Sequence, residues 1–428
     1  MQKFIYIIIF IGLACKTPDS GITIPKENDV IQKPKPKVQP ESIQEETLNY
    51  DPIDIHALNA PAGVEKDIST LVRYLIQPAK NEKEKTRAIF RWISDRIKYD
   101  TVSFFSGNYQ ASDANSVLQS RSSVCEGYAN LFNAMAEKAG LESQKITGFS
   151  KGYGYTPGKV FSKSDHAWNS VKINGKWYLL DSTWAAGYVN GKSFEKRFED
   201  FYFLTPPERF INDHLPEQEK WQLLNPPVSM SDFSEAIKKQ ASFYKLGLSK
   251  VSPSAPVLKA KDSLKLRLEG KENLVFLASL NESKDYTFIE SENGKYNVLV
   301  KSPGKGKYKL SIFAKDKASE GMYSMILEYD LEFQSGTPQN MFVKKYPVDS
   351  YLHSPRERYL DSGKEYEYKI DVPGARSLAF IDSSGEWTKV ESKNESFSYR
   401  GKFPKGELKV SANFGEKSWP VILVYQIK

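Results

Sequence analysis

The chain has few residues that bind metals or form disulfides: two cysteines, Cys15 and Cys125, and four histidines among 428 residues. These residues lie far apart and no pair has the spacing of a zinc site, so neither a structural metal nor a cofactor is expected. A strongly basic segment is also lacking, because the 60 basic and 53 acidic residues behind the net charge of +7 are spread along the chain. A nucleic-acid partner is therefore not expected.

The N-terminal residues have the pattern of an export signal. Lys3 precedes an apolar run from Phe4 to Phe10, and the small-residue exit Gly12-Leu13-Ala14 stands directly before Cys15. This pattern resembles a bacterial lipoprotein signal, which implies that residues 1–14 are removed and that Cys15 becomes the lipid-modified first residue. The alternatives are an ordinary cleaved signal peptide and an anchor too short to span a bilayer.

The lipoprotein resemblance implies an exported protein of the cell envelope, held to a bacterial membrane by the lipid on Cys15. Cys125 would then be the only free thiol, and no internal disulfide could form. Residues 15–50 contain five prolines among Lys, Glu, Gln and Ser, with few large apolar residues. They are predicted to form an extended stalk rather than a folded core.

Helical patterns come next in the chain and strand patterns follow them. The helices are predicted at about Val64–Gln77, at Asn81–Tyr99 and from Cys125 to Gly140, and the strands at Trp168–Ile173 and Lys176–Asp181. Helices followed by a sheet predict an α+β domain, which we assign to residues 51–235.

From about residue 250 the pattern changes to the alternation of apolar and polar residues that is typical of strands. Two short sequences recur in the same order, at offsets of 100 and 96 residues: Gly306–Ser311 as Gly406–Ser411, and Ile326–Tyr329 as Ile422–Tyr425. Two all-β units of about 100 residues fit immunoglobulin-like sandwich domains. We predict them at residues 250–335 and 336–428.

Cys125 is predicted to lie in the first turn of its helix. Ser123 and Glu126 have the spacing of a capping box, and Gly140 stands where a C-terminal cap is expected. The free backbone N–H groups and the dipole at a helix N-terminus favour a thiolate. Cys125 is therefore a candidate nucleophile, although a lone cysteine in such a helix is more often a small core residue.

The dipeptide Asn174-Gly175 predicts a two-residue hairpin turn, in which the numbers of paired residues add up to 349. That register pairs His166 with Thr183 and makes His166 and Asp181 diagonal neighbours on one face of the sheet. An aspartate in this position can orient an imidazole, which is the role of the third group in a nucleophilic triad.

If the Cys125 helix packs against this sheet face, the three residues can carry out acyl transfer. His166 would take the thiol proton, the thiolate would attack an amide carbonyl, and a thioester at Cys125 would remain. The backbone N–H of Cys125 is one donor for the oxyanion. Gln119 is a candidate for the second donor, the alternative being an ordinary polar residue on the approach to the helix.

These segments resemble the transglutaminase-like superfamily and, within it, the kyphoscoliosis peptidase branch. The matching motifs are Val124–Ala129, Asp165–Asn169 and Trp177–Trp184 in family order, and the resemblance extends over about His56–Phe233. It implies a papain-like fold with Cys125, His166 and Asp181 as the catalytic triad. His214-Leu215-Pro216 also looks like this branch, and we interpret His214 as structural.

The sequence thus predicts an exported cysteine-dependent enzyme that acts on amide bonds of a protein or peptide substrate. The residues leave open whether it is a peptidase, a deamidase or a transglutaminase-type acyltransferase, because water or an amine can resolve the thioester. The alternative function is that of a non-catalytic surface scaffold or adhesin that uses a transglutaminase-like domain to bind protein.

Overall fold

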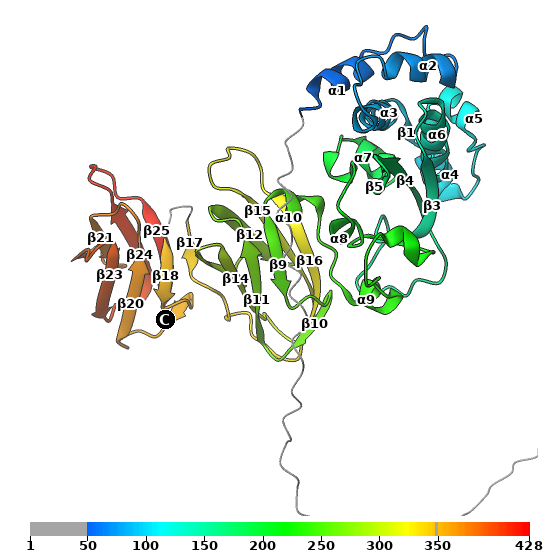
Figure 1. Ribbon diagram of the computed structural model, residues 1–428. Coiled ribbons are helices and arrows are strands. Elements are labelled where there is room, and N and C mark those ends of the chain that lie inside the picture. Colours follow the sequence, from blue (N-terminus) through cyan, green and yellow to red (C-terminus); the bar gives the residue numbers. More distant parts are fainter. Residues whose placement is uncertain (1–48, 347–349) are drawn as a thin grey trace, which may run out of the picture. The chain divides into compact units, whose positions relative to one another are not determined.

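The computed structural model describes residues 49–346 and 350–428 (Figure 1). The predicted signal, Cys15 and the predicted stalk up to residue 48 lie outside the described residues. Within the described ranges, no helix combines the length and the apolar character that crossing a lipid bilayer requires.

The first half of the described chain is an α+β domain. Its helices are α1 (Asp51–Leu58), α2 (Ile68–Leu75), α3 (Glu82–Arg96), α4 (Thr101–Ser106), α5 (Ala114–Ser120), α6 (Cys125–Lys138), α7 (Ser182–Ala186) and α8 (Pro207–Phe210). Its main sheet has the order β5-β4-β3-β8 and is antiparallel, with β3 (Ser143–Ser150), β4 (His166–Ile173), β5 (Lys176–Leu180) and β8 (His214–Pro216).

Short elements complete this domain and lead out of it. The two-stranded pairs are β1 (Lys98–Tyr99) with β2 (Ser122–Ser123) and β6 (Gly187–Asn190) with β7 (Ser193–Lys196). The 3₁₀ turns are η1 (Asp200–Tyr202) and η2 (Glu219–Gln222), and the helices that follow are α9 (Met230–Glu235) and α10 (Ala241–Lys245).

The predicted helices are present, with changed ends. Helix α2 begins at Ile68, later than predicted, because Asp67 is its N-cap and accepts a hydrogen bond of 2.9 Å from the backbone N–H of Thr70. Helix α3 begins after Asn81, whose side chain accepts from the N–H of Glu84. Helix α1 was not predicted from the sequence.

The core of this domain lies between α6 and its neighbours. Helix α6 packs against β3 and β4 on the sheet side and contacts α3 and α5 (Figure 1). Its fully buried apolar side chains recur at helical spacing: Tyr128, Leu131, Phe132, Met135 and Ala136. Burial of one helix face in this way fixes the position of the first turn of α6 against the sheet.

The hairpin register predicted from Asn174-Gly175 is confirmed from Ile173↔Lys176 to Asn169↔Leu180. The predicted extension of that register to His166 and Thr183 is wrong, because β5 ends at Leu180. Asp181 becomes the N-cap of α7, and its side chain accepts hydrogen bonds from the backbone N–H groups of the next turn. Local capping therefore ends the strand before the predicted pairs can form.

The second half of the described chain is all β, apart from α9 and α10. The first pair of sheets has the orders β10-β16-β15-β12 and β13-β14-β11-β9 and shares one buried core. Its strands are β9 (Leu248–Ser252), β10 (Val257–Ala260), β11 (Ser263–Gly270), β12 (Leu274–Leu280), β13 (Thr287–Glu292), β14 (Lys295–Lys301), β15 (Gly306–Asp316) and β16 (Ser324–Phe333).

The second pair of sheets has the orders β17-β25-β24-β21-β22 and β18-β20-β23, and it has a core of its own. Strand β19 adds to β25. The strands are β17 (Lys344–Lys345), β18 (Tyr351–Ser354), β19 (Tyr359–Leu360), β20 (Tyr366–Asp371), β21 (Ser377–Ile381), β22 (Trp387–Glu391), β23 (Ser396–Gly401), β24 (Gly406–Asn413) and β25 (Val421–Ile427).

The internal repeat corresponds to equivalent strands of the two sandwiches. The first recurring sequence begins β15 in one copy and β24 in the other, and the second lies in β16 and β25. In both copies the two strands pair antiparallel, and each register shifts once, between Ile312 and Phe313 or between Val410 and Ser411. In both copies the later strand also has a parallel neighbour, β10 or β19.

Candidate active site

Cys125 is the first residue of α6 and its side chain is partly exposed. The predicted capping box is wrong: Val124 is the N-cap, and no side chain caps this end of the helix. Ser123 instead belongs to β2, where its carbonyl accepts a hydrogen bond of 3.0 Å from the N–H of Asp100. The N–H of Gly127 donates to the carbonyl of Val124 at 3.0 Å, so the N–H groups of Cys125 and Glu126 are those that remain available near the Cys125 thiol.

The other end of α6 agrees with the prediction from Gly140. Gly140 has φ of +75°, a left-handed conformation that glycine adopts without strain. The N–H of Leu141 donates to the carbonyl of Ala136 at 2.9 Å, and the N–H of Gly140 donates to that of Glu137 at 3.0 Å. This pair of bonds is a Schellman cap, which terminates the helix before β3.

His166 lies buried at the start of β4 and contacts the rings of Trp168 and Trp184. Its Nε2 is 2.7 Å from Oδ2 of Asp181. Nδ1 is the ring nitrogen that this contact leaves free, and the ring lies near enough to the Cys125 thiol for the charge of Cys125 to act on it. Burial alone would lower the pKa of His166, but the charges of Asp181 and Cys125 outweigh it and raise that pKa above its usual value.

Asp181 is fully buried and accepts four hydrogen bonds. Oδ1 accepts from the backbone N–H groups of Thr183 at 2.7 Å and Trp184 at 3.0 Å. Oδ2 contacts Nε2 of His166 at 2.7 Å and Nε2 of His214 at 3.0 Å. Burial would raise the pKa of Asp181, but the two histidines outweigh it and hold that pKa well below the usual range.

Sequence reasoning missed His214 as a member of this group. The structure brings its ring into contact with Asp181, because β8 adds to the sheet beside β3, with Ser150 opposite His214. The adjacent Asp213 binds its Nδ1 through Oδ1 at 2.7 Å. The available signal was the resemblance of His214-Leu215-Pro216 to the family, since no local pattern predicts the β3–β8 pairing.

Gln119, the candidate second oxyanion donor, is an exposed residue of α5. It lies six residues before Cys125, and β2 separates it from α6. Its exposure favours the interpretation as a solvated polar residue.

His166, Asp181 and His214 are also the described residues whose potential ligand atoms lie together, within 4.8 Å of one another. In the structure these atoms contact each other: the two Nε2 atoms face Oδ2 of Asp181. A cation would have to replace both contacts. The arrangement therefore fits a hydrogen-bonded cluster better than a metal site.

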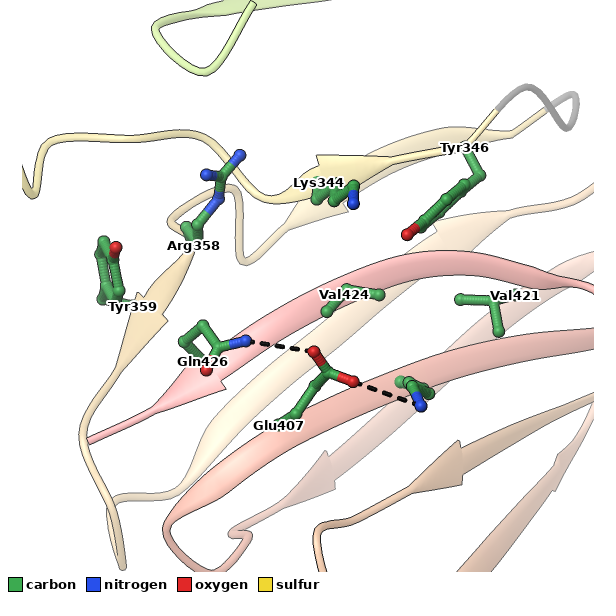
Figure 2. Close-up of a pocket in the computed structure, with 9 residues that line it drawn as sticks. Lys344, Tyr346, Arg358, Tyr359, Glu407, Val421, Val424 and Gln426 are labelled. Atoms are coloured by element: carbon green, nitrogen blue, oxygen red, sulfur yellow. Dashed lines mark hydrogen bonds and ion pairs between the residues drawn. The ribbon is translucent and has the colours of Figure 1, made fainter.

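A separate groove lies on the outer face of β24 and β25 (Figure 2). Its lining includes the cations Lys344, Arg358 and Lys409, and Glu407 pairs with Lys409 at 3.2 Å and accepts from Gln426 at 3.4 Å. None of the predicted site residues lines it. With neither a cysteine nor a histidine in its lining, this groove is not the candidate active site.

Two segments of the chain match known families. Residues 69–182 match the family described as "Transglutaminase-like superfamily", and residues 230–344 match the family described as "KY-like, immunoglobulin-like domain". The chain thus belongs to the transglutaminase-like superfamily and carries a transglutaminase-like domain followed by an immunoglobulin-like domain. This confirms the predicted fold class.

The relatives assign the branch. Kyphoscoliosis peptidase of Mus musculus is 34% identical over 319 residues, 72% of this chain and 47% of that protein. The Homo sapiens protein of the same name is 34% identical over 287 residues, which are 66% of this chain and 43% of that protein. Hillarin of Drosophila melanogaster is 30% identical over 227 residues, which are 50% of this chain and 28% of that protein. The chain lies in the kyphoscoliosis peptidase-like branch, and it spans less than half the length of these relatives.

Proposed function

We propose that the chain is a cysteine-dependent enzyme that acts on amide bonds of a protein or peptide through a thioester at Cys125. The observation that carries the proposal is the hydrogen bond of 2.7 Å between His166 and Asp181. It leaves Nδ1 of His166 for the nearby thiol of Cys125, which stands at a helix N-terminus without a side-chain cap. A nucleophile, a base and a group that orients the base are the parts of a nucleophilic triad.

In the proposed reaction, Nδ1 of His166 takes the proton of the Cys125 thiol, and the thiolate forms a bond to the amide carbonyl carbon. The backbone N–H of Cys125 stabilises the oxyanion. The carbon–nitrogen bond then breaks, the leaving amine takes the proton from His166, and a thioester remains. Water or a second amine attacks the thioester, gives a proton to His166 and releases Cys125. Asp181 holds the imidazole ring in place through both steps.

The choice of acceptor separates the possible outcomes. Water at the thioester gives peptide hydrolysis when the substrate amide is in the main chain, and deamidation when it belongs to a glutamine side chain. A lysine amine gives a crosslink. Which outcome dominates depends on how far the bound acceptor excludes water from the thioester.

The proposal is tested with the full chain, a glutamine- and lysine-containing protein and a fluorescent primary amine. Peptide cleavage, ammonia release and amine incorporation are measured together, and the acyl-enzyme is trapped by mass spectrometry. We expect Cys125→Ala and His166→Ala each to abolish the products.

The chain offers a matched control for each variant. Cys15→Ala makes the same change at the other cysteine. His353→Ala removes a histidine with the same 2.7 Å contact to an aspartate, Asp371, in the exposed surface of the last sandwich. Both controls should keep full activity. Products that persist in Cys125→Ala would overturn the proposal, and substrate binding without any turnover would favour the scaffold function.

We also propose that the protein is exported and held to a bacterial membrane by a lipid on Cys15. The support is the sequence alone, with Lys3, the apolar run Phe4–Phe10 and the small residues before Cys15. A lipid anchor followed by a proline-rich segment would keep the folded domains near the membrane surface, where envelope proteins are available as substrates.

A further inference from the structure

His214 is a buried histidine that the proposed reaction does not use. Its side chain is 0% exposed, and its ring is enclosed by Phe210 at 4.2 Å and Trp184 at 4.4 Å between ring centroids. Both ring nitrogens face carboxylates: Nδ1 is 2.7 Å from Oδ1 of Asp213, and Nε2 is 3.0 Å from Oδ2 of Asp181. A histidine held between two buried aspartates is more than a packing residue.

We propose that His214 is a positioning residue: a doubly protonated imidazolium that balances the charge of Asp213 and fixes the carboxylate of Asp181 towards His166. The role in catalysis rests on the proposed function of Cys125. The protonation of His214 does not, because it follows from the contacts of the ring itself.

The number of N–H groups needed to satisfy the two carboxylates supports the protonated form of His214. An ionised carboxylate only accepts hydrogen bonds, whereas a neutral imidazole has a single N–H. A neutral His214 would therefore turn a lone pair towards an oxygen of either Asp181 or Asp213 at hydrogen-bond distance, unless one carboxyl carries a proton. Two N–H groups satisfy both carboxylates at once.

The two carboxylates have the surroundings of ionised groups. Asp181 accepts two backbone N–H groups as well as the two rings, which occupies all of its lone-pair sites. Asp213 accepts from the hydroxyl of Tyr202 through Oδ2 at 3.1 Å and is 1% exposed. The proton that is needed between the two carboxylates therefore belongs on His214.

Charge balance gives His214 a role beyond orientation. Asp181 and Asp213 carry two negative charges and His214 one positive charge, so a single net negative charge faces the imidazole of His166. That charge matches the imidazolium that forms when Cys125 loses its proton. The other titratable or charged groups near His214 are His166 at 5.3 Å and Tyr202 at 5.8 Å between ring centroids, and Cys125 through His166. Lys151, Lys238 and Tyr244 lie near Asp213, and Tyr99 and Tyr128 lie near Asp181.

Two substitutions that each remove one charge, tested singly and together in the full chain, test this role. His214→Gln removes the positive charge, so added negative potential opposes thiol ionisation and favours the His166 imidazolium. Both limbs of the pH profile of kcat/KM should then move to higher pH. Asp213→Asn should move both limbs to lower pH. The double variant Asp213→Asn, His214→Gln restores the charge balance and should return both limbs to the wild-type position.

The rate constants separate positioning from substrate binding. In His214→Gln we expect kcat to fall about tenfold to hundredfold, the usual cost of losing a group that orients a reacting residue, while KM stays the same. His56→Gln is the matched control, because His56 lies on α1 and contacts the ring and carbonyl of Tyr74. It should change neither constant. A loss of activity in His214→Gln without movement of the limbs, or limbs that stay displaced in the double variant, would overturn the charge-balancing role.

A spectroscopic test needs neither activity nor a variant that removes His214. In Cys125→Ala protein labelled with ¹⁵N-histidine, four imidazoles give signals, and that of His214 is assigned through its contacts with Phe210 and Trp184. We expect protons on both ring nitrogens of His214 in the folded protein, one for each carboxylate. A ring nitrogen without a proton would overturn the imidazolium. Doubly protonated His214 together with a wild-type chain that turns over no substrate would instead contradict the proposed function alone.

Discussion

At the scale of single residues, Asp181 is the side chain on which the site depends most. A fully buried carboxylate is costly to desolvate, and here four donors compensate that cost. Two of them are backbone N–H groups that also begin α7. The residue that orients His166 is thus fixed by the backbone on one side and by two imidazoles on the other.

The pKa of Asp181 makes its contribution to stability depend on pH. Because the folded-state pKa is lowered below the unfolded value of about 3.9, the contribution is present above that value and is lost as pH falls through the folded-state pKa. At neutral pH, Asp181→Asn should lower the free energy of unfolding by about 3–5 kcal/mol, the usual cost of breaking a buried ion pair.

Native-state hydrogen exchange of the amides in β4 at several pH values measures this difference. The gap between wild type and Asp181→Asn should shrink as the pH drops below about 4. Asp371→Asn is the control, since its contact with His353 is largely exposed and an exposed pair contributes only about 0–1 kcal/mol. A gap that stays constant with pH would show that the charge of Asp181 does not stabilise the fold.

At the scale of elements, the entry into α6 is packed too closely for a side chain at Gly127. A Cβ there would lie 2.1 Å from Oγ of Ser123 and 2.7 Å from Cγ2 of Val117. Ser123 cannot move far, because its backbone is held in β2 beside β1. The glycine thus allows the strand and the helix to meet at the position where Cys125 lies.

Gly127→Ala should destabilise the domain by about 1–3 kcal/mol, because the cost of overpacking exceeds the gain in helix propensity of about 1 kcal/mol. Thermal unfolding of the full chain measures the change, and the rate of Cys125 alkylation should change with it. Gly63→Ala is the control, since a Cβ at Gly63 meets nothing within 4 Å. Unchanged stability in Gly127→Ala would mean that Ser123 and Val117 adjust freely.

The hairpin and its neighbours show how far the sequence alone determines these elements. Asn174 and Gly175 both have positive φ, a strong local requirement, so the register beyond them was predictable. Asp181 follows a second local preference, that of an aspartate to cap a helix, and this preference competes with the strand. The position of His214, which lies 33 positions after Asp181, depends on the pairing between β3 and β8. Short-range patterns carry no information on this pairing.

At the scale of the whole molecule, each of the three parts of the described chain has its own buried core. The internal repeat was detectable because equivalent strands of the two sandwiches keep the same order and pairing. The function of the sandwiches was not predictable, because their sequences report the burial of alternate residues and little about what the exposed faces bind.

The location of the molecule is tested through Cys15. In a bacterial host, the full chain should be recovered with membranes and incorporate labelled fatty acid, whereas Cys15→Ser should do neither, because a lipid is the only membrane attachment that we propose. Cys125→Ser is the matched control and should stay with the membranes. Fatty-acid labelling that persists in Cys15→Ser would contradict the proposed anchor.

The β3–β8 pairing also has a consequence for the order of folding. Contacts between residues far apart in sequence form later than hairpins and helices, because the chain between them must be ordered first. The β4–β5 hairpin and α6 can therefore form before β8 docks and brings in Asp213 and His214. We expect a newly made chain to pass through a stage in which its thiol is already placed but only weakly nucleophilic, which would limit side reactions until the domain is complete.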